Sequence, residues 1–237
     1  MKASRLVKEL FNSGDEKQAR ILSGFFKTGK GQYGEGDIFL GIRVPVIREI
    51  SSKYVEMDID EIQKLLNSKF HEVRFAGLVI LVKKFEKSIT NEKEIIVNFY
   101  LKNISHNINN WDLVDLSCPQ IIGRYIFEKK ENSILLKLAQ SSNLWERRVA
   151  IVSNLYAIRK SDFNNTLLIA EILLYDTHDL INKAVGWMLR EVGKKDIETE
   201  KEFLKKYFKD MPRVSLRYAI ERMDNKEKIY FMNKENN

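Results

Sequence analysis

The chain of 237 residues is 44% hydrophobic and 31% charged, and its lysines and arginines exceed its acids to give a net charge of +7. This composition is typical of a globular protein with a substantial core and excludes an intrinsically disordered one. The positive charge favours an anionic partner such as a nucleic acid. A single cysteine, Cys118, excludes an intramolecular disulfide and favours a reducing compartment. Because no apolar run approaches the roughly 18 residues of a membrane helix, we expect a soluble cytoplasmic protein without membrane contact.

Helical periodicity begins with an amphipathic N-terminal segment, MKASRLVKELF, which lacks the apolar stretch of a signal peptide. The clearest loop is residues 27–44, KTGKGQYGEGDIFLGIRV, with five of the eleven glycines, and a new helix is expected to open at Ile42–Pro45. Apolar residues then recur at steps of three and four, as at Ile62, Leu65 and Leu66, which predicts an all-α fold. Short polar breaks separate the later helices, at residues 68–70, 109–110, 141–143, 176–177 and 209–212.

Five segments of the chain align with one another. They are VRFAGLVIL (73–81), NWDLVDLSC (110–118), RRVAIVSNL (147–155), INKAVGWML (181–189) and SLRYAIERM (215–223). The aligned residues are Ala76, Leu113, Ala150, Ala184 and Ala219, at successive steps of 37, 37, 34 and 35 residues. This spacing suits two-helix units stacked in register, although coincidence among helices of similar length is the alternative. We therefore predict a single domain over residues 1–237, a curved α-solenoid of HEAT-like repeats with a concave basic groove.

Unusual side chains occupy related positions of these repeats. Trp111 and Arg148 both stand two residues before the aligned position, and Asp115 stands two after it, one helical turn from Trp111. Trp187 and Arg190 stand three and six residues after it. Since residues four apart share a helix face, these side chains are expected to converge on one patch. A carboxylate beside indole rings on a basic surface predicts a cationic substrate.

The segments NNWDLVD, LWERRVAIVS, AVGWMLREVGK and FLGIRVP resemble the AlkD-type DNA alkylation-repair glycosylases, and the resemblance covers nearly the whole chain. It implies a HEAT-like fold and removal of cationic N3- or N7-alkylated purines, such as 3-methyladenine and 7-methylguanine, from duplex DNA. It also implies that Asp115 is the catalytic carboxylate, that Trp111 and Trp187 border the deoxyribose and that Arg148 binds a phosphate. The glycine-rich segment 29–36 departs from the family pattern, and its role is open.

Physical chemistry supports the same reading. An alkylated purine carries a positive charge and leaves as a neutral base, so no general acid is needed. A developing oxocarbenium ion requires only nearby negative charge and a water, which Asp115 can provide and orient. Indole faces attract cationic groups by about 0.5–2 kcal/mol. We therefore expect a monofunctional glycosylase of base excision repair with no cofactor. Selectivity would follow from the lability of the lesion, so the base need not be flipped.

The sequence also allows other interpretations of these residues. The two tryptophans could be core aromatics, Asp115 could pair with Arg124, and Arg148 could bridge repeats; Trp145, without a repeat-matched partner, is assigned to packing. The protein could then be a non-catalytic HEAT-like module that binds DNA of unusual shape, or a protein-binding scaffold. Phosphate contacts are predicted for Arg147, Arg148, Lys183 and Arg190, with Arg74, Arg124 and Arg217 as further candidates.

Three scattered histidines and one cysteine predict no metal site. Cys118 is expected to be a small buried residue rather than a nucleophile. No lysine lies in the WDLVD turn, which argues against lyase activity. The expected partner is double-stranded DNA containing alkylated purines, bound by a monomer and, in a bacterium, in the nucleoid.

Overall fold

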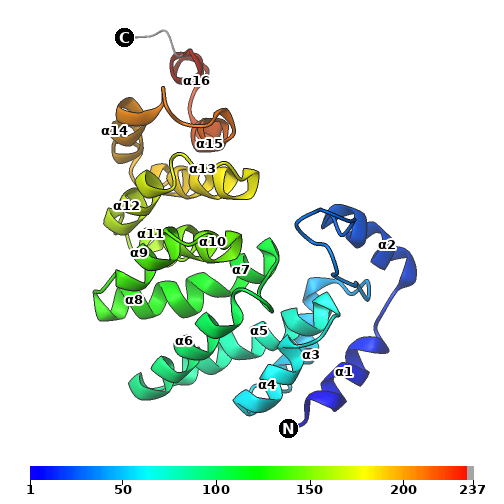
Figure 1. The fold of residues 1–237 in the computed structure, drawn as a ribbon. Coiled ribbons are helices and arrows are strands. Elements are labelled where there is room, and N and C mark those ends of the chain that lie inside the picture. The colour runs from blue at the N-terminus through cyan, green and yellow to red at the C-terminus, as the bar shows by residue number, and fades with distance from the viewer. Residues whose placement is uncertain (234–237) are drawn as a thin grey trace. The chain divides into compact units, whose positions relative to one another are not determined.

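The computed structural model describes residues 1–233, and their regular structure is helical, with sixteen α-helices, a π-helical turn and a 3-10 turn (Figure 1). One isolated β-bridge joins Ile38 and Phe70. The predicted all-α class is therefore confirmed. The chain divides into two compact units, Met1–Ser117 and Cys118–Asn237. No helix in the described part of the chain is long and apolar enough to span a membrane.

The first unit is organised around its longest helix, α5, which packs against α3, α4 and α6. Twelve of the seventeen residues of α5 are buried, as expected for a helix that is apolar around most of its circumference. The helices of this unit are α1 (Ala3–Phe11), α2 (Glu16–Phe25), α3 (Val44–Ser52), α4 (Ile59–Leu66), α5 (His71–Lys87), α6 (Thr90–Asn103) and α7 (Trp111–Cys118).

The second unit is a stack of helices in chain order, in which α10 packs against α9 and α13, and α13 packs against α14 and α15. The predicted break at 141–143 holds a helix cap, because the side chain of Asn143 accepts the backbone N–H groups of Trp145 and Glu146. The helical segments are η1 (Pro119–Gly123), α8 (Arg124–Lys129), α9 (Ser133–Ala139), α10 (Leu144–Val152), α11 (Leu155–Arg159), α12 (Asn164–Ile172), α13 (Asp179–Gly193), α14 (Ile197–Tyr207), α15 (Arg213–Ala219), η2 (Ile220–Arg222) and α16 (Asn225–Met232).

The positions aligned in the sequence are all packing positions. They lie on α5, α7, α10, α13 and α15, and each is at most 1% exposed: Ala76, Leu113, Ala150, Ala184 and Ala219. Small residues let neighbouring helices of the second unit approach closely. A Cβ atom on Gly186 of α13 would lie only 2.2 Å from the carbonyl oxygen of Ser215, next along the stack.

The glycine-rich segment between α2 and α3 follows a path fixed by α5. The Glu72 carboxylate accepts three consecutive backbone N–H groups, those of residues 40–42, at 2.9, 2.8 and 3.2 Å. At the middle one, Gly41 has a φ of +82°, and a Cβ atom there would lie 2.0 Å from the carbonyl oxygen of Asp15. Only glycine fits this conformation and this approach. The loop then ends at Val44, where the predicted helix begins.

Candidate functional site

Trp111 and Asp115 lie one turn apart on α7 and therefore on the same face of that helix. The helix begins at Trp111 because the Asn110 side chain accepts the Trp111 backbone N–H at 2.8 Å. Leu113, on the opposite face, and its neighbour Val114 are fully buried, whereas Trp111 and Asp115 are half-buried and reach the surface. A carboxylate and an indole are thus presented together, in a regular helical spacing.

The Trp111 indole is half-buried and packs against other aromatic rings. Phe26 stacks on it, with ring centroids 5.1 Å apart and planes 17° apart, and Phe39 stacks on Phe26 at 4.9 Å. Phe25, which is 62% exposed, meets the indole edge to face at 6.0 Å. The indole Nε1–H donates to the hydroxyl of Tyr33 at 3.3 Å. These contacts fix both the plane and the rotation of the indole.

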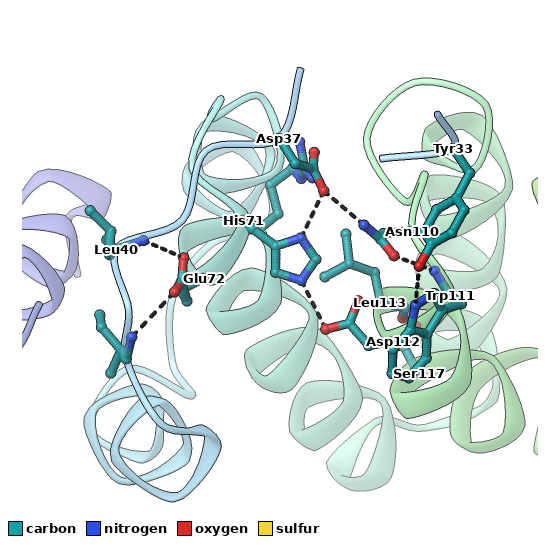
Figure 2. A network of polar contacts seen from close by, with 12 residues as sticks. Tyr33, Asp37, Leu40, His71, Glu72, Asn110, Trp111, Asp112, Leu113 and Ser117 are labelled. Atoms are coloured by element: carbon teal, nitrogen blue, oxygen red, sulfur yellow. Dashed lines mark hydrogen bonds and ion pairs between the residues drawn. The ribbon is translucent and has the colours of Figure 1, made fainter. Parts of the chain in front are cut away.

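A buried polar network lies behind this helix (Figure 2). The imidazole of His71 bridges two carboxylates, with Nδ1 2.9 Å from Asp37 and Nε2 2.8 Å from Asp112. Asp37 also accepts hydrogen bonds from Arg74 and, at 2.9 Å, from the side-chain amide of Asn110. His71 itself is only 2% exposed. The network joins the glycine-rich loop, the start of α5 and the first turn of α7.

The network carries balanced charges near neutral pH. Burial alone would lower the pKa of His71, but the charges of Asp112 and Asp37 and their hydrogen bonds outweigh it and raise the pKa to about 9. Burial would likewise raise the pKa of Asp37, yet the hydrogen bond from His71 and the charge of Arg74 lower it to about 2. His71 is therefore an imidazolium whose two N–H groups both donate. A buried imidazolium between carboxylates is a rigid cross-link.

In the second unit, α10 carries two of the predicted phosphate-binding arginines. The Arg147 guanidinium binds Asp176 at 2.6 Å and the carbonyl oxygens of residues 141 and 142 at 2.9 Å. Arg148 is 5% exposed and donates to the carbonyl oxygen of Leu180 at 2.6 Å, which ties α10 to the start of α13. Both arginines therefore contribute to the packing of this unit.

The helix α13 carries the remaining predicted residues along one face. Lys183 pairs with Asp179 at 2.7 Å, and its side chain is 39% exposed. One turn on, the half-buried Trp187 donates its indole N–H to Glu191 at 3.1 Å. Within this unit, α10 and α13 thus bring an indole and several cations onto neighbouring helices.

Arg190, at the end of the same helix, is paired with Glu221 and is 17% exposed at its side chain. It also faces the buried Glu200 of α14. Burial raises the pKa of Glu200 to about 8, although the charge of Arg190 opposes the rise. Glu200 therefore keeps its proton near neutral pH, and Arg190 takes Glu221 as its charged partner.

Two of the expectations drawn from the sequence concern buried residues. Trp145 is 7% exposed and Cys118 is fully buried, so both predicted packing roles are confirmed. Between residues 1 and 233 no group of three histidine, cysteine or acidic side chains is arranged to hold a metal ion. Convergence of Trp111 and Asp115 with Arg148 and the α13 residues stays a prediction.

The sequence alone does not reveal the buried network. His71 is one of three histidines scattered along the chain, and no pattern in the sequence assigns a role to Asp37 or Asp112. The partners of His71 are 34 and 41 residues away in the chain, so no local spacing reveals them. An aspartate within a glycine-rich loop and a histidine at a helix start were the available signals.

The model of the DNA alkylation repair enzyme family matches residues 6–223, nearly the whole chain. The chain belongs to this family. Membership indicates a role in the repair of alkylated DNA, with DNA as the partner. A comparison with curated protein sequences found no match.

Two solved structures of bacterial proteins share the fold of this family member. One, from Enterococcus faecalis, is described as a predicted DNA alkylation repair enzyme; it has a TM-score of 0.72 and 17% identity, over 90% of this chain and 98% of its own. The other, smu.31 from Streptococcus mutans UA159, has a TM-score of 0.55 and 18% identity, over 94% of this chain and 98% of its own. At such identities the likeness concerns the fold alone.

Proposed function

We propose that this family member is a monofunctional DNA glycosylase. Its substrates would be cationic N3- and N7-alkylated purines in duplex DNA, such as 3-methyladenine and 7-methylguanine. The observation that carries the proposal is the pairing of Trp111 and Asp115, one turn apart on α7 and both reaching the surface, in a chain of an alkylation repair family. Alkylation at N3 or N7 gives the purine a positive charge, and a surface carboxylate such as Asp115 attracts that charge.

The chemistry follows from the charge of the lesion. The bond between C1′ and the purine nitrogen breaks, its electron pair neutralises the alkylated base, and C1′ becomes electron-deficient. Asp115 stabilises that developing cation and orients the water whose oxygen forms the new bond to C1′, and the proton passes to the carboxylate or to solvent. The face of Trp111 packs against the deoxyribose. No covalent intermediate with the protein is required.

The cations of the second unit supply the phosphate contacts in this proposal. Lys183 is the most exposed of the four candidates and its pairing with Asp179 is a surface ion pair, which a phosphate can replace at little cost. Arg148 and Arg190 are more enclosed, and Arg147 is held by three hydrogen bonds within the fold. We further propose that Trp187 joins Trp111 at the deoxyribose and that residues 1–237 act as one domain of HEAT-like repeats and as a monomer.

A duplex with a single 7-methylguanine, incubated with excess protein, tests the activity. The proposal predicts release of free 7-methylguanine and no adduct on borohydride treatment, because the enzyme forms no Schiff base. A matched duplex with the neutral lesion 1,N6-ethenoadenine should release no base. Tight binding without any release would instead make the protein a non-catalytic module that recognises DNA of unusual shape. Release of the neutral lesion at a similar rate would contradict the charge-based mechanism.

A further inference from the structure

The glycine-rich loop, residues 27–43, is hydrogen-bonded through its backbone to the residues at the start of α5. Its Ile38 exchanges backbone hydrogen bonds with the residues that open α5, donating to the Lys69 carbonyl at 3.2 Å and accepting from the His71 N–H at 2.8 Å. The backbone N–H groups of residues 40–42 donate to Glu72, and Figure 2 shows the bond from Leu40. Its backbone is therefore held against the N-terminal turn of α5 at two points.

Three side-chain links run from this region to α7. The first is the hydroxyl of Tyr33, which accepts the Trp111 Nε1–H at 3.3 Å. The second is Asp37, which holds Asn110 at 2.9 Å, the residue whose side chain in turn accepts the Trp111 backbone N–H. The third runs from Asp37 through His71 to Asp112. Residues 110, 111 and 112, where α7 begins, are each tied to the loop.

We propose that the glycine-rich loop is a positioning element for the candidate site. It sets the indole of Trp111 through Tyr33, and it sets the first turn of α7, and with it Asp115, through Asp37 and His71. This inference rests on the proposed function and assigns a role to the glycine-rich loop, which the sequence leaves open.

The geometry explains why such support matters. Asp112 and Asp115 are three residues apart on one helix, so a rotation of the first turn that relaxes the His71 contact also moves the Asp115 carboxylate. One face of the indole packs on Phe26 and its N–H donates to Tyr33 at the edge, so the tilt and the rotation of the ring are both held. Errors of about 1 Å in such positions cost large factors in rate.

The test compares two variants with two matched controls in the same unit. Tyr33→Phe removes only the hydroxyl that meets Trp111, and Tyr54→Phe removes a hydroxyl that binds Glu9, far from α7 in sequence. His71→Gln breaks the bridge between two carboxylates. Glu61→Gln weakens a buried carboxylate that pairs with exposed lysines and accepts the backbone N–H of residue 3.

Two kinds of measurement are made on each variant. One is the single-turnover rate of 7-methylguanine release together with the duplex dissociation constant. The other is the 19F spectrum of protein labelled with 5-fluorotryptophan, in which the Trp111 resonance is assigned by Trp111→Phe. Tyr33→Phe should shift the Trp111 resonance, slow release about three- to tenfold and leave duplex affinity within about twofold. His71→Gln should slow release more, by about ten- to a hundredfold. The control variants should change neither measurement.

A titration adds a readout that mere loss of stability would not produce. The Trp111 resonance of the wild type should move with a midpoint at about pH 9, together with the imidazole proton signal of His71, and this movement should vanish in His71→Gln. An unmoved Trp111 resonance in both Tyr33→Phe and His71→Gln would overturn the inference. If the wild type releases no base, the proposed function fails, and the fluorine spectra alone decide whether the loop positions Trp111.

Discussion

In the first unit, Trp111 and Asp115 lie on a short helix supported by an irregular loop, whereas in the second unit Trp187 and the candidate cations lie on helices packed in a regular stack. The support of α7 consists of a buried imidazolium, two carboxylates and stacked rings. The support of α10 and α13 consists of helix contacts and of ion pairs with nearby acids.

This difference indicates that the first unit positions the reacting groups and that the second unit binds phosphates. Directional hydrogen bonds and stacked rings hold a few atoms to within a fraction of an ångström, as chemistry at C1′ requires. Surface ion pairs can be exchanged for phosphates of any sequence, as DNA binding requires. Changes to the loop should therefore alter stability and rate, and changes to the ion pairs should alter affinity and its salt dependence.

The largest effect on stability is expected from Gly41→Ala. A side chain at this position meets both a φ of +82° and a backbone carbonyl 2.0 Å away, so we expect a loss of about 3–4 kcal/mol. Gly36→Ala is the matched control, since Gly36 has a φ of +89° but open space around it, and it should cost about 1 kcal/mol. Denaturant unfolding measures both, and equal losses would show that the close approach of Gly41 to the Asp15 backbone does not confine the loop.

The second largest effect is a dependence of the free energy of unfolding on pH. Because the pKa of His71 is raised from 6.5 to about 9 on folding, its stabilising contribution is complete below about pH 6.5 and is lost as the pH rises through 9. We expect the wild type to lose about 2–3 kcal/mol across this range. His71→Gln should remove most of that slope, and His106→Gln, at an exposed histidine, should retain it. A slope unchanged by His71→Gln would contradict the assignment.

A change at Glu200 should act in the opposite direction, by stabilising the second unit. Since burial raises its pKa from 4.5 to about 8, the unfolded chain releases this proton first, and stability falls as the pH rises from 4.5 to 8. Glu200→Gln should therefore gain about 1–2 kcal/mol above about pH 8 and nothing at about pH 5. Thermal melts at the two pH values would reveal this, with the exposed Glu198→Gln as control.

The smallest expected effect is on duplex affinity and concerns the ion pairs of Arg190 and Lys183. Glu221→Gln releases Arg190 from its charged partner, and Asp179→Asn releases Lys183. Each should tighten duplex binding about two- to threefold at low salt and steepen its salt dependence. Glu202→Gln, at an exposed acid of α14, controls for the general loss of negative charge. If all three variants tighten binding equally, the ion pairs are not the phosphate-binding positions.

Much of the fold could be predicted from the sequence, because burial has the same period as the helix. Positions such as Ala76, Ala150 and Ala184 share a neighbourhood of apolar residues at regular steps, and all are buried. The loop could also be located from its glycines. Its path could not, because the path depends on Glu72 accepting three backbone N–H groups, a contact without a sequence signature.

The candidate residues themselves could be proposed from repeat positions, but most of their partners could not. The pairing of Lys183 with Asp179 follows from the i,i+4 spacing on one helix. The pairings of Arg147 with Asp176 and of Arg190 with Glu221 depend instead on how the helices pack. The bridge from Asp37 through His71 to Asp112 joins three segments of the chain. Such long-range polar contacts follow from the fold rather than from local periodicity.

The role of Asp115 in catalysis is tested by comparing Asp115→Asn with the wild type on a duplex containing one 7-methylguanine. Base release and duplex affinity are measured on the same samples, with Asp60→Asn on the exposed face of α4 as an isosteric control. We predict that Asp115→Asn slows release by at least about 100-fold while affinity is equal or tighter, because repulsion from the phosphates is reduced. Release at the wild-type rate by folded Asp115→Asn would contradict the account.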